Sequence, residues 1–160
     1  MEQDTISRQW RRTARGRLRF ELSGIAFARA MGFAPEDWAK HLWSSGAVRW
    51  IGKAIPTARE YLLKEAEAFE ALYPEVAFEL GKLNDLEAEL TFRRGCLGGW
   101  GKNQWAMAKS AGLGKGHVCR YCRQAFRSWA SQLGLHSCAE PQTDETCILW
   151  VKSGVAAGFS

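Results

Sequence analysis

The hydrophobic pattern of the chain changes its period near residue 75, and this change constrains the fold more than any other feature. Over residues 58–73 the apolar side chains recur at helical spacing, with charged residues on the other face. From Val76 to Phe92 the apolar residues instead alternate with polar ones, which is the period of a β-strand. The chain therefore has to combine an amphipathic helix with a sheet that has one buried face.

Two alternating runs lie on either side of the turn-like segment "GKLNDL", residues 81–86. This arrangement predicts a β-hairpin over residues 76–93. The alternation assigns each side chain to one face of the sheet. We expect burial of Phe78, Leu90 and Phe92, and solvent exposure of Glu87 and Glu89.

Glycine and proline residues delimit the other expected elements. Residues 1–74 should be mainly helical, with interruptions at Gly16 and Gly24, a short helix opened by Pro35, and the amphipathic helix closed by Pro74. Beyond the hairpin we expect two more helices and a last strand in "TCILWVK". The first of these helices should run from Lys102 to Gly112 or Gly114 and the second from His117 to Leu133, and the strand should cover residues 146–152.

This order of elements favours an α+β fold, with helices packed on a small antiparallel sheet. A chain of 160 residues has the usual size of one compact domain. We therefore expect a single domain over residues 1–152 and a flexible tail over 153–160. Neither a secretory leader nor an apolar run of bilayer length is visible, which predicts a cytoplasmic location and reduced thiols.

The charge of the chain, formally +5, is distributed unevenly. Residues 60–89 are rich in glutamate, whereas arginines concentrate near the N-terminus. These arginines are Arg11, Arg12, Arg15, Arg17 and Arg19. Since a basic segment attracts acidic surfaces, we expect it to contact a partner protein or a second copy of the chain. No helix-turn-helix, zinc-finger or RNA-binding signature accompanies the segment, so neither nucleic acid nor a membrane is an expected partner.

The segment "HVCRYC" places Cys119 and Cys122 one turn apart on an expected helix, on the side that faces the core. Three interpretations stay open. The thiols are small core side chains, or they bind zinc or an iron–sulfur cluster together with Cys96 and Cys138. In the third, Cys119 is a reactive thiolate, because His117, the neighbouring Arg120 and the helix start lower its pKa.

The eight tryptophans of this short chain suggest an aromatic-walled pocket. Cys96 leaves the second expected strand and enters "LGGWG", where glycines let a substrate approach the backbone closely. Rim arginines are suited to bind a carboxylate through two hydrogen bonds. The candidate substrate-binding residues are Arg93, Arg94, Trp100, Trp105 and Arg120.

Three segments together resemble a known family: "RRGCLGG", "HVCRYCRQAFRSWASQLGL" and "DETCILWV". They are similar to the L-2-amino-thiazoline-4-carboxylic acid hydrolase-like family and, in broader pattern, to the 4-vinyl reductase domain. The resemblance covers roughly residues 75–152 and implies helices packed on a small antiparallel sheet. It also implies that Cys96, Cys119, Cys122 and Cys147 match the recurrent cysteines of the family. "TDETC" stands where a Gly-Asp-Asp type turn is usual.

These observations together favour a small enzyme of hydrolase or ring-opening type. Its substrate would be a small heterocyclic molecule containing sulfur and nitrogen, and it would need no cofactor. Cys96, Cys119 and His117 are the candidate catalytic residues, with a cysteine as nucleophile and His117 as general base. The alternative is a non-catalytic sensor domain that binds a small ligand, zinc, an iron–sulfur cluster or a tetrapyrrole.

Overall fold

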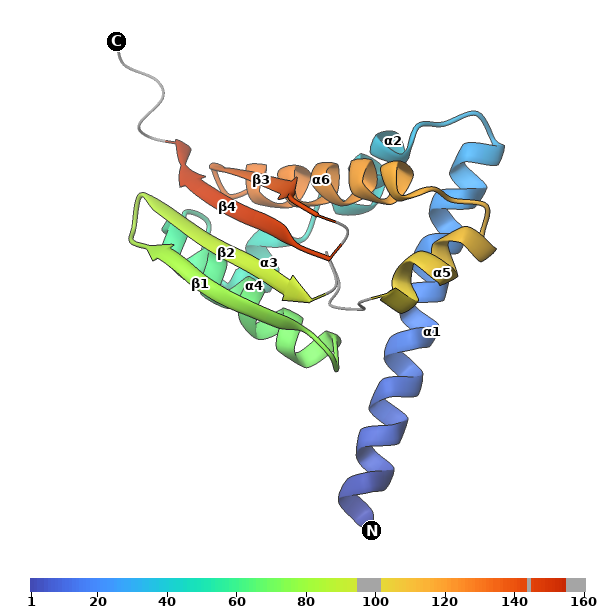
Figure 1. Cartoon of the computed structure of the whole chain (residues 1–160). Coiled ribbons are helices and arrows are strands. Elements are labelled where there is room, and N and C mark those ends of the chain that lie inside the picture. The colour runs from blue at the N-terminus through green and yellow to red at the C-terminus, as the bar shows by residue number, and fades with distance from the viewer. Residues whose placement is uncertain (95–101, 144, 155–160) are drawn as a thin grey trace.

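Two β-hairpins lie side by side and form a four-stranded antiparallel sheet (Figure 1). The computed structural model describes residues 1–94, 102–143 and 145–154. The strands are β1 (Ala77–Leu83), β2 (Glu87–Arg94), β3 (Leu135–Pro141) and β4 (Cys147–Ser153), in the order β1-β2-β4-β3. The predicted hairpin over 76–93 and the predicted α+β class are both confirmed.

The first hairpin turns at Asn84, whose side-chain oxygen accepts hydrogen bonds from the backbone N–H groups of Leu86 and Glu87. This local bond is the reason that asparagine favours turns. Leu90 and Phe92 are fully buried, as the alternation predicts. Phe78 is only half-buried, because it lies on the edge strand β1, where the pairing with β2 is irregular.

Strand β3 is absent from the sequence-based prediction. Its buried side chains Leu135, Ser137 and Ala139 do alternate with more exposed ones, but two of the three are small. The alternation is therefore weak as a hydrophobic signal. In the structure β4 pairs with β2 along one edge and with β3 along the other.

Six helices complete the described part of the chain. They are α1 (Glu2–Ala30), α2 (Pro35–Trp43), α3 (Ala47–Ile51), α4 (Ala58–Leu72), α5 (Lys102–Ser110) and α6 (Lys115–Ser131). Helix α4 begins with a reciprocal cap, in which Thr57 Oγ1 accepts from the Glu60 N–H and Glu60 accepts from the Thr57 N–H. The short helix α3 was not predicted.

Helix α1 passes through Gly16 and Gly24 without a break, so the predicted interruptions were wrong. Gly24 has a packing role instead. A Cβ atom at this position would lie 2.9 Å from Nε1 of Trp38, closer than real Cβ contacts allow. The missing side chain therefore lets α2 pack closely on α1.

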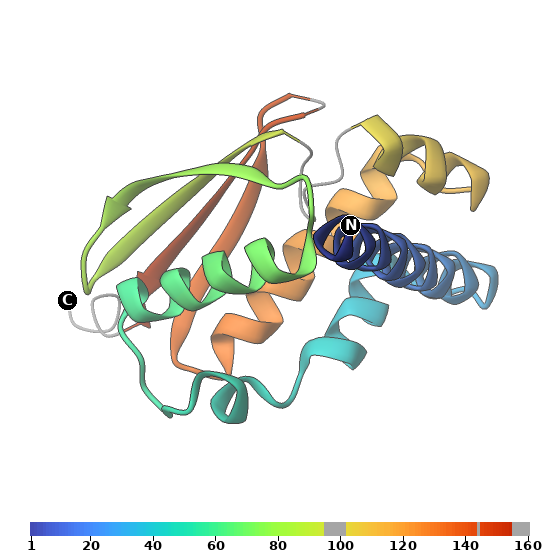
Figure 2. The same ribbon diagram turned by 90° about the horizontal axis from the view of Figure 1, so that it is seen from below.

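Helices α4 and α6 cover one face of the sheet (Figure 2). Tyr61 and Leu62 of α4 and Leu133 beyond α6 pack there against Leu90 and Leu149 of the sheet, all fully or almost fully buried. Each side chain of this size contributes about 1.5–3 kcal/mol when buried. This cluster is the main core, and it fixes α4 and α6 relative to each other.

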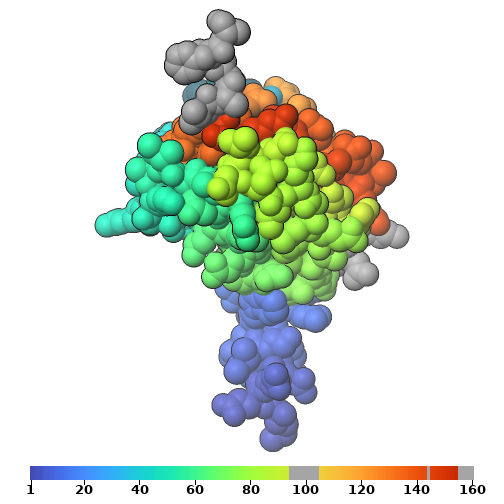
Figure 3. Space-filling model, turned by 90° about the vertical axis from the view of Figure 1, so that its left-hand side faces the viewer, coloured from blue at the N-terminus to red at the C-terminus, as the bar shows by residue number. Residues whose placement is uncertain are grey.

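A second apolar cluster joins α1 to α2, α5 and α6. It holds the C-terminal half of α1 against the body of the molecule through Leu18, Leu22 and Ile25. The N-terminal end of α1 projects away from the body (Figure 3), as far as Trp10, whose Nε1 donates to the backbone oxygen of Ala71. The space between the two clusters contains the site described next.

Candidate functional site

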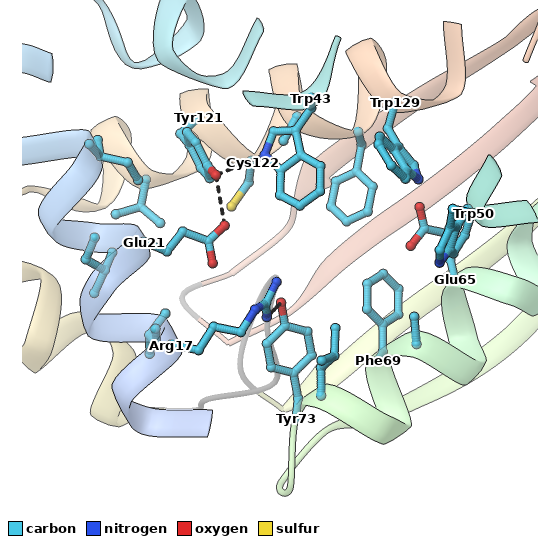
Figure 4. A pocket seen from close by; sticks show the side chains of 18 residues that line it. Arg17, Glu21, Trp43, Trp50, Glu65, Phe69, Tyr73, Tyr121, Cys122 and Trp129 are labelled. Atoms are coloured by element: carbon cyan, nitrogen blue, oxygen red, sulfur yellow. Dashed lines mark hydrogen bonds between the residues drawn. The ribbon is translucent and has the colours of Figure 1, made fainter. Parts of the chain in front are cut away.

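A pocket of about 300 Å³ lies between α1, α4 and α6, with α2 and α3 closing one side (Figure 4). Seven of its lining side chains are aromatic: Trp43, Trp50, Phe69, Tyr73, Tyr121, Phe126 and Trp129. Some of the rings pack edge to face, as do Trp43 and Trp129, whose centroids are 5.4 Å apart, and others are tilted against each other. The aromatic-walled pocket suggested by the tryptophan content is therefore present, although its walls come from other residues than those proposed.

Regular helical spacing brings these side chains to one place. On α6 the pocket is lined at positions 118, 121, 122, 125, 126 and 129, and on α4 at 65, 68, 69 and 72. Both sets follow the i, i+3, i+4, i+7 pattern of a single helix face. On each of the two helices, the face that packs in the core therefore also lines the pocket.

Glu65 is the one acidic side chain among the buried residues that the structure describes, with 7% of its surface exposed. Its Oε1 accepts a 2.7 Å hydrogen bond from the hydroxyl of Tyr61. Burial raises the pKa of Glu65 to about 7, an effect that the Tyr61 hydroxyl only partly offsets. The pocket wall therefore contains a carboxyl group that changes its charge near neutral pH.

A chain of hydrogen bonds occupies the opposite side of the pocket. Nε1 of Trp43 donates to the Tyr121 hydroxyl at 3.0 Å, and that hydroxyl donates to Oε1 of Glu21 at 2.9 Å. Nη1 of Arg17, one turn earlier on α1, donates to the Tyr73 hydroxyl at 3.0 Å. Burial lowers the pKa of Arg17, but Tyr73 and Glu21 outweigh it, so the net shift is upward and the guanidinium stays charged.

Cys122 lines this pocket, between Tyr121 and Tyr73 in Figure 4. It is half-buried and packs against both apolar clusters. Its partner in the CxxC motif, Cys119, is also half-buried but does not line the pocket. The two thiols therefore have different surroundings, which their spacing alone did not indicate.

The predicted activation of Cys119 is wrong in direction. Burial raises the pKa of its thiol, and the positive charges of Lys115 and Arg123 only partly oppose this effect. His117 is committed elsewhere, since its Nδ1 accepts a 2.9 Å hydrogen bond from the Gly114 N–H at the start of α6. Positions two apart on a helix also point about 200° from each other, so His117 is not directed at Cys119.

Cys119 and Cys138 lie close enough to Cys147 to act on its titration. Burial, followed by the charges of these two thiols, raises the pKa of Cys147 to about 12. Within residues 1–94, 102–143 and 145–154, however, no three histidine, cysteine, aspartate or glutamate side chains converge as metal ligands. Cys96, the fourth cysteine of the predicted metal set, lies outside the described residues.

Two of the three predicted substrate-binding arginines, Arg93 and Arg120, form ion pairs away from the pocket. Arg93 pairs with Glu79 on the exposed face of the sheet at 2.6 Å. Arg120 pairs with Glu36 of α2 at 2.6 Å, which joins α2 to α6. Neither arginine lines the aromatic pocket.

Trp105 of α5 contacts both apolar clusters and lies under the ammonium group of Lys115, 5.7 Å from its ring centroid. It belongs to the core rather than to the pocket wall. Trp100 and the side chain of Arg94 lie outside the described part of the chain. Among the predicted catalytic and substrate-binding residues that the structure describes, Arg93, Trp105, His117, Cys119 and Arg120, none lines the aromatic pocket.

Glu65 was missed by the sequence-based prediction, although the sequence carries a signal for it. It follows Tyr61 by four residues and precedes Phe69 by four, so it lies in the middle of the apolar face of α4. An acidic residue at such a position is rarely buried without a partner. Arg17 and Glu21 had no comparable signal, because charged residues recur along α1 from Glu2 to Glu21.

Among the described residues, no helix is both long and apolar enough to cross a membrane. Comparison of the chain with protein-family models, with curated proteins and with solved structures gave no match.

Proposed function

We propose that this protein binds a small planar molecule that carries a nitrogen base, in the aromatic pocket between α1, α4 and α6. The size of the cavity, about 300 Å³, suits a molecule of one or two rings. Aromatic walls favour a flat ligand, because stacked and edge-to-face contacts stabilise rings beyond simple burial. The same walls also attract a positive charge through their π faces.

The buried carboxyl of Glu65 is the observation that carries this proposal. An ionised buried carboxylate lowers the stability of the empty protein, and the Tyr61 hydroxyl supplies a hydrogen bond to Oε1 only, so a donor on a ligand in the pocket would stabilise it further. A protonated amine or a ring N–H supplies that partner as a hydrogen-bond donor. A cationic ligand would also lower the pKa of Glu65 and keep the carboxylate charged.

Arg17 and Glu21 do not change the preference of the pocket for a ligand that is positively charged or carries an N–H donor. They are one turn apart on α1, and the charge of Glu21 stabilises the guanidinium of Arg17. Their opposite charges compensate each other at their end of the pocket (Figure 4). The charge at the other end is set by Glu65, which lies near Trp50 in the same view.

Three probes with the same ring and different charge test the proposal: tryptamine, indole and indole-3-acetate. Binding is followed at pH 8 by equilibrium dialysis with the full chain. We expect tryptamine to bind at least about tenfold more tightly than indole-3-acetate, which corresponds to about 1.4 kcal/mol. Between pH 6 and pH 8 the affinity for tryptamine should rise, because Glu65 loses its proton over this range.

The matched variant is Glu65→Gln, which keeps the shape of the side chain and removes its charge. This variant should bind tryptamine and indole with similar affinity, and its binding should not vary between pH 6 and pH 8. Tighter binding of indole-3-acetate than of tryptamine by the wild-type protein would contradict the proposal. Unchanged selectivity in the variant would show that another group recognises the charge.

Hydrolysis or ring opening of a small heterocycle is a second candidate function. One observation favours it: Glu65, with a pKa of about 7, shares the pocket with the thiol of Cys122. A carboxyl with such a pKa is suited to take a proton from water and return it to a leaving group near neutral pH. Turnover of L-2-amino-thiazoline-4-carboxylate by the wild-type protein, lost in Glu65→Gln and retained in His117→Gln, would establish this function. Ligand binding without turnover would leave the binding function alone.

A further inference from the structure

Helix α1 contains seven arginines and no lysine. Five of them share a single face, about 100° wide at 3.6 residues per turn, with successive spacings of three, one, three and four residues. We call Arg8, Arg11, Arg12, Arg15 and Arg19 the arginine stripe. The structure makes the stripe continuous, because α1 runs through Gly16 without a break.

The arginine stripe is exposed along its whole length and is poorly neutralised. Arg11 makes one long ion pair with Glu75, at 4.0 Å, and Arg8 donates to the backbone oxygen of Asp4. Arg12, Arg15 and Arg19 form no ion pair or hydrogen bond with any residue that the structure describes. Several like charges held on one face repel one another unless an external anion lies beside them.

The stripe begins on the projecting end of α1 and continues along the exposed face of the helix, where a long partner has access to it (Figures 1 and 3). Where α1 meets α5, the stripe continues into a groove that Arg15 and Arg19 line together with the hydroxyl-bearing residues Ser23 and Ser110. Guanidinium and hydroxyl groups are the side-chain donors that contact phosphate oxygens in protein–DNA complexes. The groove therefore extends the same chemistry from the free helix onto the body of the molecule.

The length of the stripe fits a regular row of phosphates. Arg8 and Arg19 are separated by eleven residues, a rise of about 16 Å along the helix. One strand of duplex DNA presents about five phosphates over this length. Arginine in place of lysine adds a planar fork of donors that binds a phosphate through two hydrogen bonds.

Protein and membrane partners fit the stripe less well, because a protein interface has an apolar core and a membrane-bound helix has an apolar face. Among the described residues, apolar ones accompany the stripe only in the groove beside α5, where Leu22, Ala106, Met107 and Ala111 line it. The exposed apolar residues of α1 nearest to the stripe, Phe20 and Phe27, are 84% and 65% exposed. Helical geometry places them about 120° around the helix from the centre of the stripe. We propose that the arginine stripe binds the sugar–phosphate backbone of duplex DNA without base specificity, in addition to ligand binding in the pocket.

Fluorescence anisotropy with a labelled 24-base-pair duplex tests this proposal, with the full chain between 50 and 200 mM NaCl. The wild-type affinity should fall steeply with salt. The variant Arg12→Gln, Arg15→Gln, Arg19→Gln should bind more weakly and should reduce the slope of log K against log salt by about 2.7, or about 0.9 for each lost phosphate contact. Glutamine is a good helix former, so α1 should stay folded, which circular dichroism checks.

The matched control removes the same charge from elsewhere: Arg49→Gln, Arg59→Gln, Arg127→Gln, on α3, α4 and α6. It should keep nearly the wild-type salt slope. Equal slopes for the two triple variants would overturn the proposal, because net charge alone would then explain binding. Failure of the wild-type protein to bind the duplex at 50 mM NaCl would also overturn it. So would tighter binding to anionic phosphatidylserine vesicles or to poly-glutamate than to the duplex.

Discussion

Glu65 shows how one residue can link stability to function. Its pKa is about 7 in the folded protein and about 4.5 when the chain is unfolded. Between these two values the folded state binds more protons than the unfolded state, so stability falls as pH rises from about 4.5 to about 7. Above pH 7 both states are ionised, and the full cost of the buried charge is present.

The substitution Glu65→Gln should therefore change stability in a pH-dependent way. Glutamine keeps an oxygen that accepts from the Tyr61 hydroxyl but carries no charge. We expect the variant to be more stable than the wild type at pH 8 and to lose most of this advantage at pH 5. The rise of the Glu65 pKa from 4.5 to about 7 corresponds to a difference in unfolding free energy of about 3 kcal/mol at most. Urea unfolding at the two pH values measures the difference, and a pH-independent difference would show that Glu65 does not titrate as described.

Sequence-based prediction was least successful for the roles of individual side chains. Cys119 and His117 were paired because they are neighbours in the sequence, but burial raises the thiol pKa and a backbone bond occupies the imidazole. Proximity in sequence gives neither burial nor orientation. Both depend on what α6 packs against, which no local pattern contains.

At the scale of elements, periodicity was a reliable guide. The hydrophobic spacing predicted α4 and the hairpin of β1 and β2, and proline at its first position predicted α2. Failures occurred where local signals were weak or misleading. Small residues concealed β3, and Gly24 marked a close contact with Trp38 rather than a helix break.

The start of α6 offers a test of an element-level interaction. His117 Nδ1 accepts from the Gly114 N–H, a bond that only the neutral imidazole can make. Partial desolvation, together with the charges of Arg29 and Arg120, lowers the pKa of His117. The stability that the bond contributes is therefore present above about pH 6.5 and is lost as the pH falls through the lowered pKa.

Replacing His117 with alanine should cost about 1 kcal/mol of unfolding free energy at pH 8, the usual loss for a helix cap. The cost should be smaller at pH 5, where the wild-type imidazole is protonated. His117→Glu provides the control, because glutamate at the same position can accept the same bond and stays ionised at both pH values. Thermal unfolding of the three proteins compares them. An equal cost of the alanine substitution at the two pH values would rule out a role for the neutral imidazole.

At the scale of the whole molecule, the pocket exists because helices distant in sequence meet. Arg17 and Glu21 come from α1, Glu65 from α4 and Tyr121 from α6. The apolar faces of α4 and α6 could be anticipated from their spacing, and the tryptophan content pointed to aromatic walls. Their convergence could not be anticipated, because it depends on how α1 packs beside the layer formed by α4 and α6 (Figure 2).

Filling the pocket tests most directly whether it is the ligand-binding site. Ala68 lines the pocket from α4, whereas Ala71, three residues later, is exposed. Isothermal titration calorimetry with tryptamine at pH 8 compares the wild type with Ala68→Phe and with Ala71→Phe, after circular dichroism has shown that all three are folded. We expect one site of equal affinity in the wild type and in Ala71→Phe, and binding at least about tenfold weaker in Ala68→Phe, since the added ring occupies the space of the ligand. Wild-type affinity in a folded Ala68→Phe variant would contradict this account, because the ligand would then bind elsewhere.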